Sequence, residues 1–355
     1  MRRRFLIGVV VIALVAGGAA VVLWLRGGND TGLEKAVDVV PSATKRLAFT
    51  DWAKVRAELG VKSIDSTPEQ LSKWLSRAYD RDYSSTSSMS EDAVPIARAF
   101  GFSPANADWE AYAQSDDGAA MVLRMNDGVH FDHLAAELTS VGYKKPASST
   151  GVWKGGADLL STISTEISPE LQYVVLLADQ HTVVTSDTVG YAAKAAKVVS
   201  GDARSLADAD ASSHDMAGQV AEPASAVLWA RDYACSDLAM SQASSAAQRQ
   251  ADQLIGKAGK TSALSGLLMA MSGSRKLDVV EAFDSSAQAK ENLRARATLA
   301  VGPAVGRGSD TFATDFKLTA SRTRDASVVL TLVPRDPAQF VISALYDGPL
   351  IFATC

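Results

Sequence analysis

The chain has 355 residues, of which 47% are hydrophobic and 21% charged, so it can bury a core and is neither disordered nor collagen-like. Its net charge is -5, and the rest of the chain is more acidic still once the arginines at 2–4 and Arg26 are set aside. An acidic body without a basic stripe argues against nonspecific nucleic-acid binding, because phosphate neutralisation needs clustered Lys and Arg.

Residues 5–25 form an apolar run of 21 residues without a charge, long enough as a helix to span about 30 Å of bilayer hydrocarbon. We expect an uncleaved transmembrane signal anchor. Small residues at 17–20 keep a cleaved secretory peptide open as the alternative, although the run continues apolar beyond them. Three arginines before the run against Arg26 after it predict that residues 1–4 are cytoplasmic and the body is outside. No other window is as long and apolar, so we expect a single-pass protein of the cytoplasmic membrane.

The two cysteines, Cys235 and Cys355, both belong to this body, where an oxidising compartment permits disulfides. We expect a disulfide between them that ties down the last residue of the chain. Two separate buried thiols are the alternative. A metal-binding or redox-active pair is disfavoured because the sequence has no CxxC spacing.

Residues 26–43 contain Gly and Pro and are expected to be a juxtamembrane linker. Beyond them, apolar spacing predicts helices over 51–59, from Thr67 to about Ala78, and from Glu91 to near Gly101. The polar, Ser-rich segment 80–92 is expected to be a surface loop.

From residue 109 onward, four units of two strands followed by a helix are predicted. They comprise strands 109–114 and 119–125 with helix 131–141, strands 173–177 and 182–185 with helix 188–199, strands 267–271 and 277–283 with helix 286–300, and strands 316–321 and 327–333 with a helix beginning at Pro337. A strand at 226–230 and a helix at about 237–255 lie between the second and third units.

This order predicts an α+β fold in which antiparallel sheets have one face covered by helices. The repeated pattern suggests two similar halves, 44–205 and 206–355, and leaves open whether they form one sheet or two.

No recognised catalytic frame is present. The segment Gly256–Ser262 (GKAGKTS) ends like a phosphate loop but follows a helix, and the glycines at 302–308 lack dinucleotide-loop spacing. We therefore assign no catalytic and no cofactor-binding residue.

The chain has four histidines. His130 and His133, near Asp127 and Asp132, have a spacing that suits a metal site, but exposed polar residues at a helix start are the favoured interpretation. His214 and Asp215 are only sequence neighbours and orient no nucleophile. We assign no metal ligand.

Other polar and aromatic residues have simpler interpretations. Asp116 and Asp117 are read as turn residues rather than a catalytic carboxylate pair. Trp153, between Gly151 and Lys154, is expected to be exposed.

The basic N-terminus, the single apolar run, the Ala-, Ser- and Asp-rich body and the segment Phe49–Gly60 (FTDWAKVRAELG) together resemble uncharacterised single-pass envelope proteins of actinobacteria. The resemblance rests on residues 1–60 and on composition. It implies an envelope location and brings no activity, cofactor or site residue.

These observations favour a membrane-anchored extracytoplasmic binding or assembly protein of the bacterial cell envelope, whose partner is an envelope protein, a lipid or a cell-wall component. The alternative is an extracytoplasmic hydrolase that acts on envelope material without a recognisable motif. A sensor is disfavoured because residues 1–4 are too short for an output domain.

Overall fold

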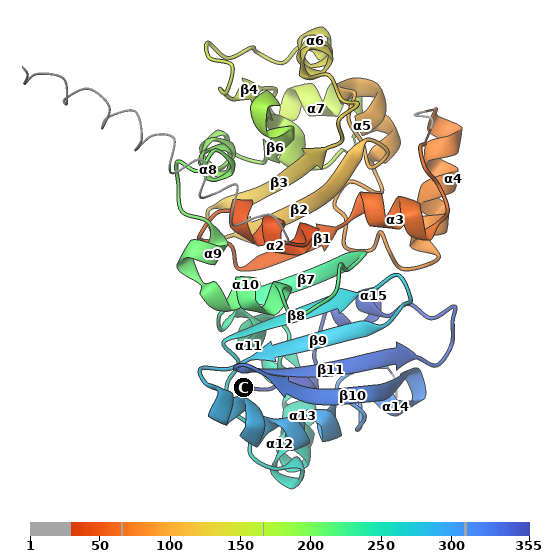
Figure 1. Cartoon of the computed structure of the whole chain (residues 1–355), viewed down its shortest axis with the longest axis vertical. Helices are drawn as coiled ribbons and strands as arrows, with labels where there is room; N and C mark the ends of the chain where they lie inside the picture. The colour runs from red at the N-terminus through yellow and green to blue at the C-terminus, as the bar shows by residue number, and fades with distance from the viewer. Residues whose placement is uncertain (1–29, 65–66, 166, 309–310) are drawn as a thin grey trace, which may run out of the picture.

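The computed structural model describes residues 30–64, 67–165, 167–308 and 311–355. They form one antiparallel sheet of 11 strands in the order β10-β11-β9-β8-β7-β1-β2-β3-β6-β5-β4 (Figure 1). The strands are β1 (Arg46–Thr50), β2 (Ala107–Ser115), β3 (Gly118–Met125), β4 (Trp153–Lys154), β5 (Tyr173–Leu177), β6 (Thr182–Ser186), β7 (Ser225–Ala230), β8 (Gly266–Met271), β9 (Leu277–Ala282), β10 (Phe316–Arg324) and β11 (Ser327–Pro334).

Helices cover both faces of this sheet, because both faces are apolar. In β1, Leu47 and Phe49 belong to one buried cluster and Ala48 to the other, as the alternation of side chains along a strand requires. The first face, called the α2 face, carries α2 (Gly32–Val39), α8 (Val189–Val199), α9 (Leu206–Ala209) and α10 (Ala211–Ala217). The expectation of helices on one face only was therefore wrong.

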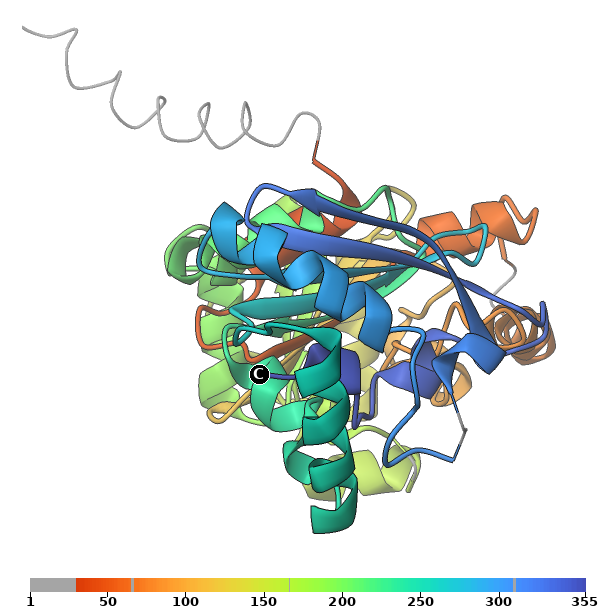
Figure 2. The ribbon, with the colours of Figure 1, turned by 90° about the horizontal axis from the view of Figure 1, so that it is seen from below.

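The opposite face, called the α4 face, carries the larger apolar cluster. Its helices are α3 (Trp52–Glu58), α4 (Pro68–Tyr79), α5 (Ala93–Phe100), α6 (Phe131–Val141), α7 (Ala157–Ile163), α11 (Tyr233–Asp237), α12 (Ser245–Ala258), α13 (Ser286–Leu299), α14 (Phe312–Asp315) and α15 (Ile342–Leu345). Seen along the sheet, α12 and α13 lie on one side of the strands and α2 on the other (Figure 2).

The strand order repeats outward from the centre. One half reads β1-β2-β3-β6-β5 and the other β7-β8-β9-β11-β10, and β1 pairs with β7 in the middle. The preceding helices also correspond, because α2 leads into β1, α10 leads into β7, and these two helices contact each other. The halves thus share one continuous sheet, and residue 205 stays our predicted division between them.

Most of the predicted hairpins and helices are present near their expected bounds. The predicted helix 237–255 is wrong in its first part, since α11 ends at Asp237 and α12 begins at Ser245, with the short η3 (Met240–Gln242) between them. The last predicted helix begins at Ile342 and not at Pro337.

The prediction of a linker over residues 26–43 is wrong for residues 32–39. Residues 32–39 form α2, which Thr31 caps by accepting a hydrogen bond from the Glu34 N–H, and Leu33, Ala36 and Val37 are buried. An amphipathic helix with a capping box packs against a core, whereas a linker stays solvated.

The predicted anchor, residues 5–25, lies outside the described residues. Within the ranges that the structure describes, we find no helix with the length and apolar character needed to span a bilayer.

The predicted disulfide between Cys235 and Cys355 is confirmed, with the two Cα atoms 5.7 Å apart. It joins α11 to the last residue of the chain, across a sequence separation of 120 residues. The C-terminus therefore lies against the helices of the α4 face (Figure 2).

A loop of this length makes the disulfide a strong constraint on the unfolded chain. Replacing both cysteines by serine is expected to lower the free energy of unfolding by up to about 5 kcal/mol, because the unfolded state regains loop-closure entropy. Urea unfolding of the variant and of the oxidised wild type measures this difference. An unchanged unfolding midpoint would contradict it.

Asp82 connects the two halves across the α4 face. Its carboxylate Oδ2 accepts hydrogen bonds from the backbone N–H groups of Val341 (2.6 Å) and Ile342 (2.8 Å), at the start of α15. The side chain is fully buried, and the backbone φ of +60° lies in the left-handed region that Asp and Asn tolerate better than most residues.

Replacing Asp82 by alanine is expected to cost about 2–4 kcal/mol of stability, because two buried N–H groups lose their acceptor. Asp82→Asn keeps an acceptor oxygen and the tolerance of positive φ, so its loss is expected to be smaller. Asp80→Ala, at an exposed position, is the control. Equal stability of Asp82→Ala and this control in urea unfolding would refute the role of Asp82.

Candidate functional site

A cavity of about 230 Å³ lies over the centre of the sheet on the α4 face. Its floor is made by three adjacent strands, where Ala48 of β1 has Tyr112 of β2 and Val227 of β7 as cross-strand neighbours. The residues that line it are Arg46, Ala48, Ser85, Thr86, Ser87, Ser88, Tyr112, Gln114, Val227 and Tyr346. The small side chain of Ala48, in the middle of the floor, leaves this space open.

Arg46, at the start of β1, is the charged residue of the cavity wall. Its guanidinium carbon lies 5.6 Å from the centroid of the Trp229 ring and 5.2 Å from that of the Tyr346 ring. Its Nε is buried and has no hydrogen-bond partner among the described residues. The faces of such rings attract a cation without supplying a conventional hydrogen-bond acceptor.

The Ser-rich segment 80–92 forms another wall of the cavity. It is a loop, as expected, but not a surface loop throughout, because Asp82, Tyr83 and Met89 are almost fully buried. The segment is held to the sheet by Thr86, whose hydroxyl lies 2.9 Å from the carbonyl oxygen of Phe49 and 2.9 Å from the hydroxyl of Thr50. A polar sequence can be buried in this way because its hydroxyls find partners.

Glu110 of β2 anchors this wall from below. Its carboxylate accepts hydrogen bonds from the Ser87 hydroxyl (2.7 Å), the Ser88 N–H (2.7 Å), the Ser88 hydroxyl (2.8 Å) and Trp52 Nε1 (3.1 Å). Burial raises the pKa of Glu110 above its usual value, and the hydrogen bonds from Ser87 and Ser88 oppose that rise. Glu110 therefore positions the loop.

Tyr112 is also committed to a partner, since its hydroxyl donates to Glu170 Oε1 at 2.7 Å. Burial and this hydrogen bond raise the pKa of Tyr112 well above its ordinary value. The hydroxyls of Ser87, Ser88 and Tyr112 thus donate to carboxylates outside the cavity. The Arg46 guanidinium is the charged donor left to meet a ligand, which makes the cavity suited to binding.

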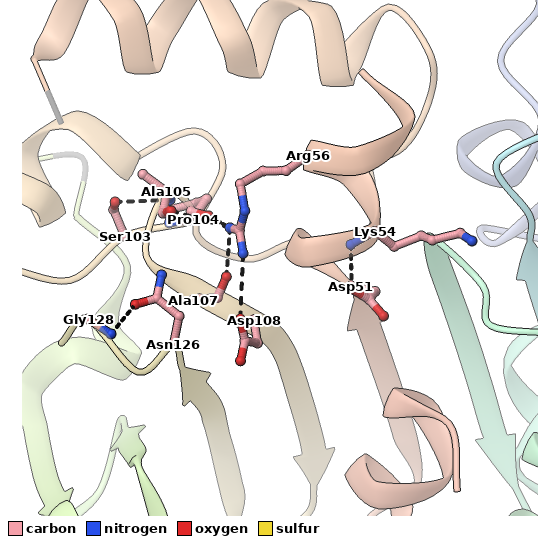
Figure 3. Close-up of polar contacts among 10 residues, drawn as sticks. All are labelled: Asp51, Lys54, Arg56, Ser103, Pro104, Ala105, Ala107, Asp108, Asn126 and Gly128. Atoms are coloured by element: carbon pink, nitrogen blue, oxygen red, sulfur yellow. Dashed lines mark hydrogen bonds and ion pairs between the residues drawn. The ribbon is translucent and has the colours of Figure 1, made fainter. Parts of the chain in front are cut away.

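A second polar cluster surrounds Arg56 of α3 (Figure 3). One terminal nitrogen donates to the carbonyl oxygens of Pro104 (3.0 Å), Ala105 (3.3 Å) and Ala107 (2.8 Å), and the other lies 3.6 Å from Asp108. This arrangement holds α3 against the chain that leads into β2. With its carbonyl partners and Asp108 in place, we interpret Arg56 as structural.

Asp51 also belongs to this region. It caps α3 by accepting a hydrogen bond from the Lys54 N–H at 2.7 Å, and burial raises its pKa to about 6 (Figure 3).

Asp30, Asp38 and His214 offer ligand atoms that lie within 4.8 Å of one another on the α2 face. His214 Nε2 is 3.7 Å from Asp38 Oδ2, so the imidazole pairs with Asp38 and not with its sequence neighbour Asp215. Burial raises the pKa of Asp38, and His214 opposes that rise. These groups could hold a cation, although partly exposed carboxylates often gather without one. His130 and His133 are exposed, as the favoured interpretation expected.

The other residues singled out by the sequence serve the fold. Asp116 and Asp117 lie between β2 and β3, where they pair with Lys45 (2.6 Å) and Lys194 (2.9 Å). Gly256–Ser262 begins in the last turn of α12 and continues beyond its C-terminus, so it follows a helix, as the sequence indicated. Trp153 was expected to be exposed and is 3% exposed in β4, so that expectation was wrong.

The cavity residues Arg46 and Tyr346 and the loop hydroxyls are not among the residues singled out from the sequence. One usable signal was present: Arg46 and Ala48 share a face of the short strand RLAFT, whose other face carries Leu47 and Phe49. A charged residue on a strand that is apolar on both faces needs an explanation.

No known protein family matches this chain, and no curated protein matches it. A solved structure, crystal form I of TP0453, is 8% identical and covers 90% of this chain and 99% of its own, with a TM-score of 0.39. A likeness of this size supports no statement about fold or function.

The role of Glu110 predicts a selective loss of stability. Glu110→Gln is expected to destabilise the protein by about 2–4 kcal/mol, because its amide N–H₂ would face the fixed donors of Ser88 and Trp52. Glu170→Gln is the matched control, since the Tyr112 hydroxyl can rotate to accept. Urea unfolding compares the two. Equal losses would mean that Glu110 has no special role in holding the loop.

Proposed function

We propose that this protein is a membrane-anchored extracytoplasmic binding protein of the bacterial cell envelope and that the cavity beside Arg46 is its binding site. The observation that carries the binding role is the buried Arg46 Nε, which borders a cavity and has no acceptor among the described residues. A buried charged donor without a partner is costly, and a ligand that supplies an acceptor relieves this cost.

The envelope location is supported by the N-terminal sequence and by the disulfide. The apolar run at residues 5–25, with more arginines before it than after it, is typical of a signal anchor with its C-terminal side outside. The Cys235–Cys355 bond suits a compartment in which disulfides persist.

In the proposed arrangement, the anchor is attached to the body through α2. Residues 26–31 connect the apolar run to α2 and reach at most about 20 Å when extended. Since α2 packs on the α2 face and the cavity lies on the α4 face, the binding site is on the opposite side of the sheet from the connection.

The hydrolase alternative has no observation in its favour among the described residues. The serine hydroxyls beside the cavity donate to Glu110, whereas a nucleophilic serine needs a neighbouring base such as histidine. None of the histidines lines the cavity.

Expression of the full chain in a bacterium tests the location. We expect the intact, unprocessed mass in the membrane fraction, degradation by protease added outside spheroplasts, and no free thiol on alkylation. The matched control, Val11→Arg with Leu14→Arg, places two charges in the apolar run, each costing about 3 kcal/mol at a helix centre. This control is expected to leave the membrane fraction.

Two results would overturn the proposal. A shortened chain in the soluble exported fraction would indicate a cleaved secretory peptide and no anchor. A cytoplasmic chain with free thiols would exclude the envelope location.

A further inference from the structure

We propose that the cavity beside Arg46 binds a small organic anion through a carboxylate or phosphate group. This inference rests on the proposed binding function and names the class of ligand. It depends on three features of the cavity: its uncompensated charge, the orientation of its arginine and its size.

The first feature is charge. Arg46 forms no ion pair with any residue that the structure describes, and none of the residues lining the cavity is acidic. The buried carboxylates of Glu110, Glu170 and Asp82 already accept hydrogen bonds, from Ser88, from Tyr112 and from the backbone of Val341 respectively. Within the described part of the chain, the cavity thus has a cation in its wall that no carboxylate pairs with.

The second feature is orientation. The guanidinium carbon of Arg46 lies over the rings of Trp229 and Tyr346, which hold the cation in place, while its Nε–H has no acceptor among the described residues. Trp229 is itself fixed, because its Nε1 donates to Asp237 Oδ2 at 2.6 Å. A preorganised guanidinium binds the two oxygens of a carboxylate or phosphate through parallel hydrogen bonds.

The third feature is size. At about 230 Å³ the cavity is smaller than the roughly 300–1,000 Å³ of pockets for drug-sized ligands. It therefore fits a small acid or the charged end of a larger molecule. The hydroxyl oxygens of Ser87 and Ser88 and the rings of Tyr112 and Tyr346 provide a mixed polar and aromatic lining.

Titration calorimetry on the full chain in neutral detergent tests the proposal with defined probes. Benzoate and glycerol 3-phosphate represent the two acid groups, and benzamide is the uncharged match of benzoate. At least one anion is expected to bind about tenfold or more tightly than benzamide, because charge-assisted hydrogen bonds are lost in the amide. Binding of dihexanoyl phosphatidic acid in place of glycerol 3-phosphate would identify a lipid headgroup as the source of the phosphate.

Variants localise the binding. Arg46→Gln is expected to weaken binding of the anion about tenfold or more. Arg46→Lys is expected to weaken it less, because lysine keeps the charge but loses the two parallel N–H donors of the guanidinium. Ala48→Leu fills the floor and is expected to abolish binding. Arg322→Gln, at an exposed arginine of β10, is the matched control and should bind normally. Thermal unfolding verifies that each variant is folded.

Absence of binding by every anion would overturn this inference, as would undiminished binding in folded Arg46→Gln or Ala48→Leu. Either result would leave the envelope location untouched, because that is read from mass, fractionation and thiol state. Conversely, a cytoplasmic chain that still binds the anion would refute the location and retain the site.

Discussion

The antiparallel pairing of β1 with β7 is the contact on which the rest of the structure depends, since it joins two halves of the same strand order into one sheet. Arg46 lies opposite Trp229, and Ala48 lies opposite Val227. On the α4 face, the centre of this β1–β7 seam is covered by the Ser-rich segment 80–92 and by the end of α15. The cavity is the space that remains between these two covers and the strands.

Covering a seam with a polar loop requires that every buried polar group finds a partner. Asp82 accepts N–H groups of α15 through its Oδ2, and Glu110 accepts hydrogen bonds from the serines and Trp52. Both carboxylates hold the walls in place. Arg46 is the charged residue of the cavity lining, and its buried Nε has no acceptor among the described residues. A charged donor that borders a cavity and has no acceptor is the physical basis for assigning a binding role to the cavity.

Features set by local sequence were predictable. The hairpin signals of 109–125 and 173–185, the helix 131–141 that ends before Gly142, and the Cys235–Cys355 pair all depend on turns, periodicity or residue type. Pairing across the halves was not predictable, because β1 and β7 are far apart in sequence and both are short.

The errors have the same origin. The loop 80–92 looks like a solvated segment until the buried acceptors Glu110 and Phe49 O are known. Trp153 stands in a Gly-rich context and is buried only through the pairing of β4 with β5. The Arg46 site combines strands, a loop and α15, so no single segment carries its signature.

The most direct test of this account is the NMR signal of the Arg46 Nε–H group, recorded while benzoate or glycerol 3-phosphate is added and assigned by its loss in Arg46→Gln. The account predicts a protected signal that shifts strongly downfield and saturates, because the buried N–H gains a charged acceptor. A signal that does not change at any anion concentration, including under conditions where calorimetry detects binding, would contradict the assignment of Arg46 as the binding group.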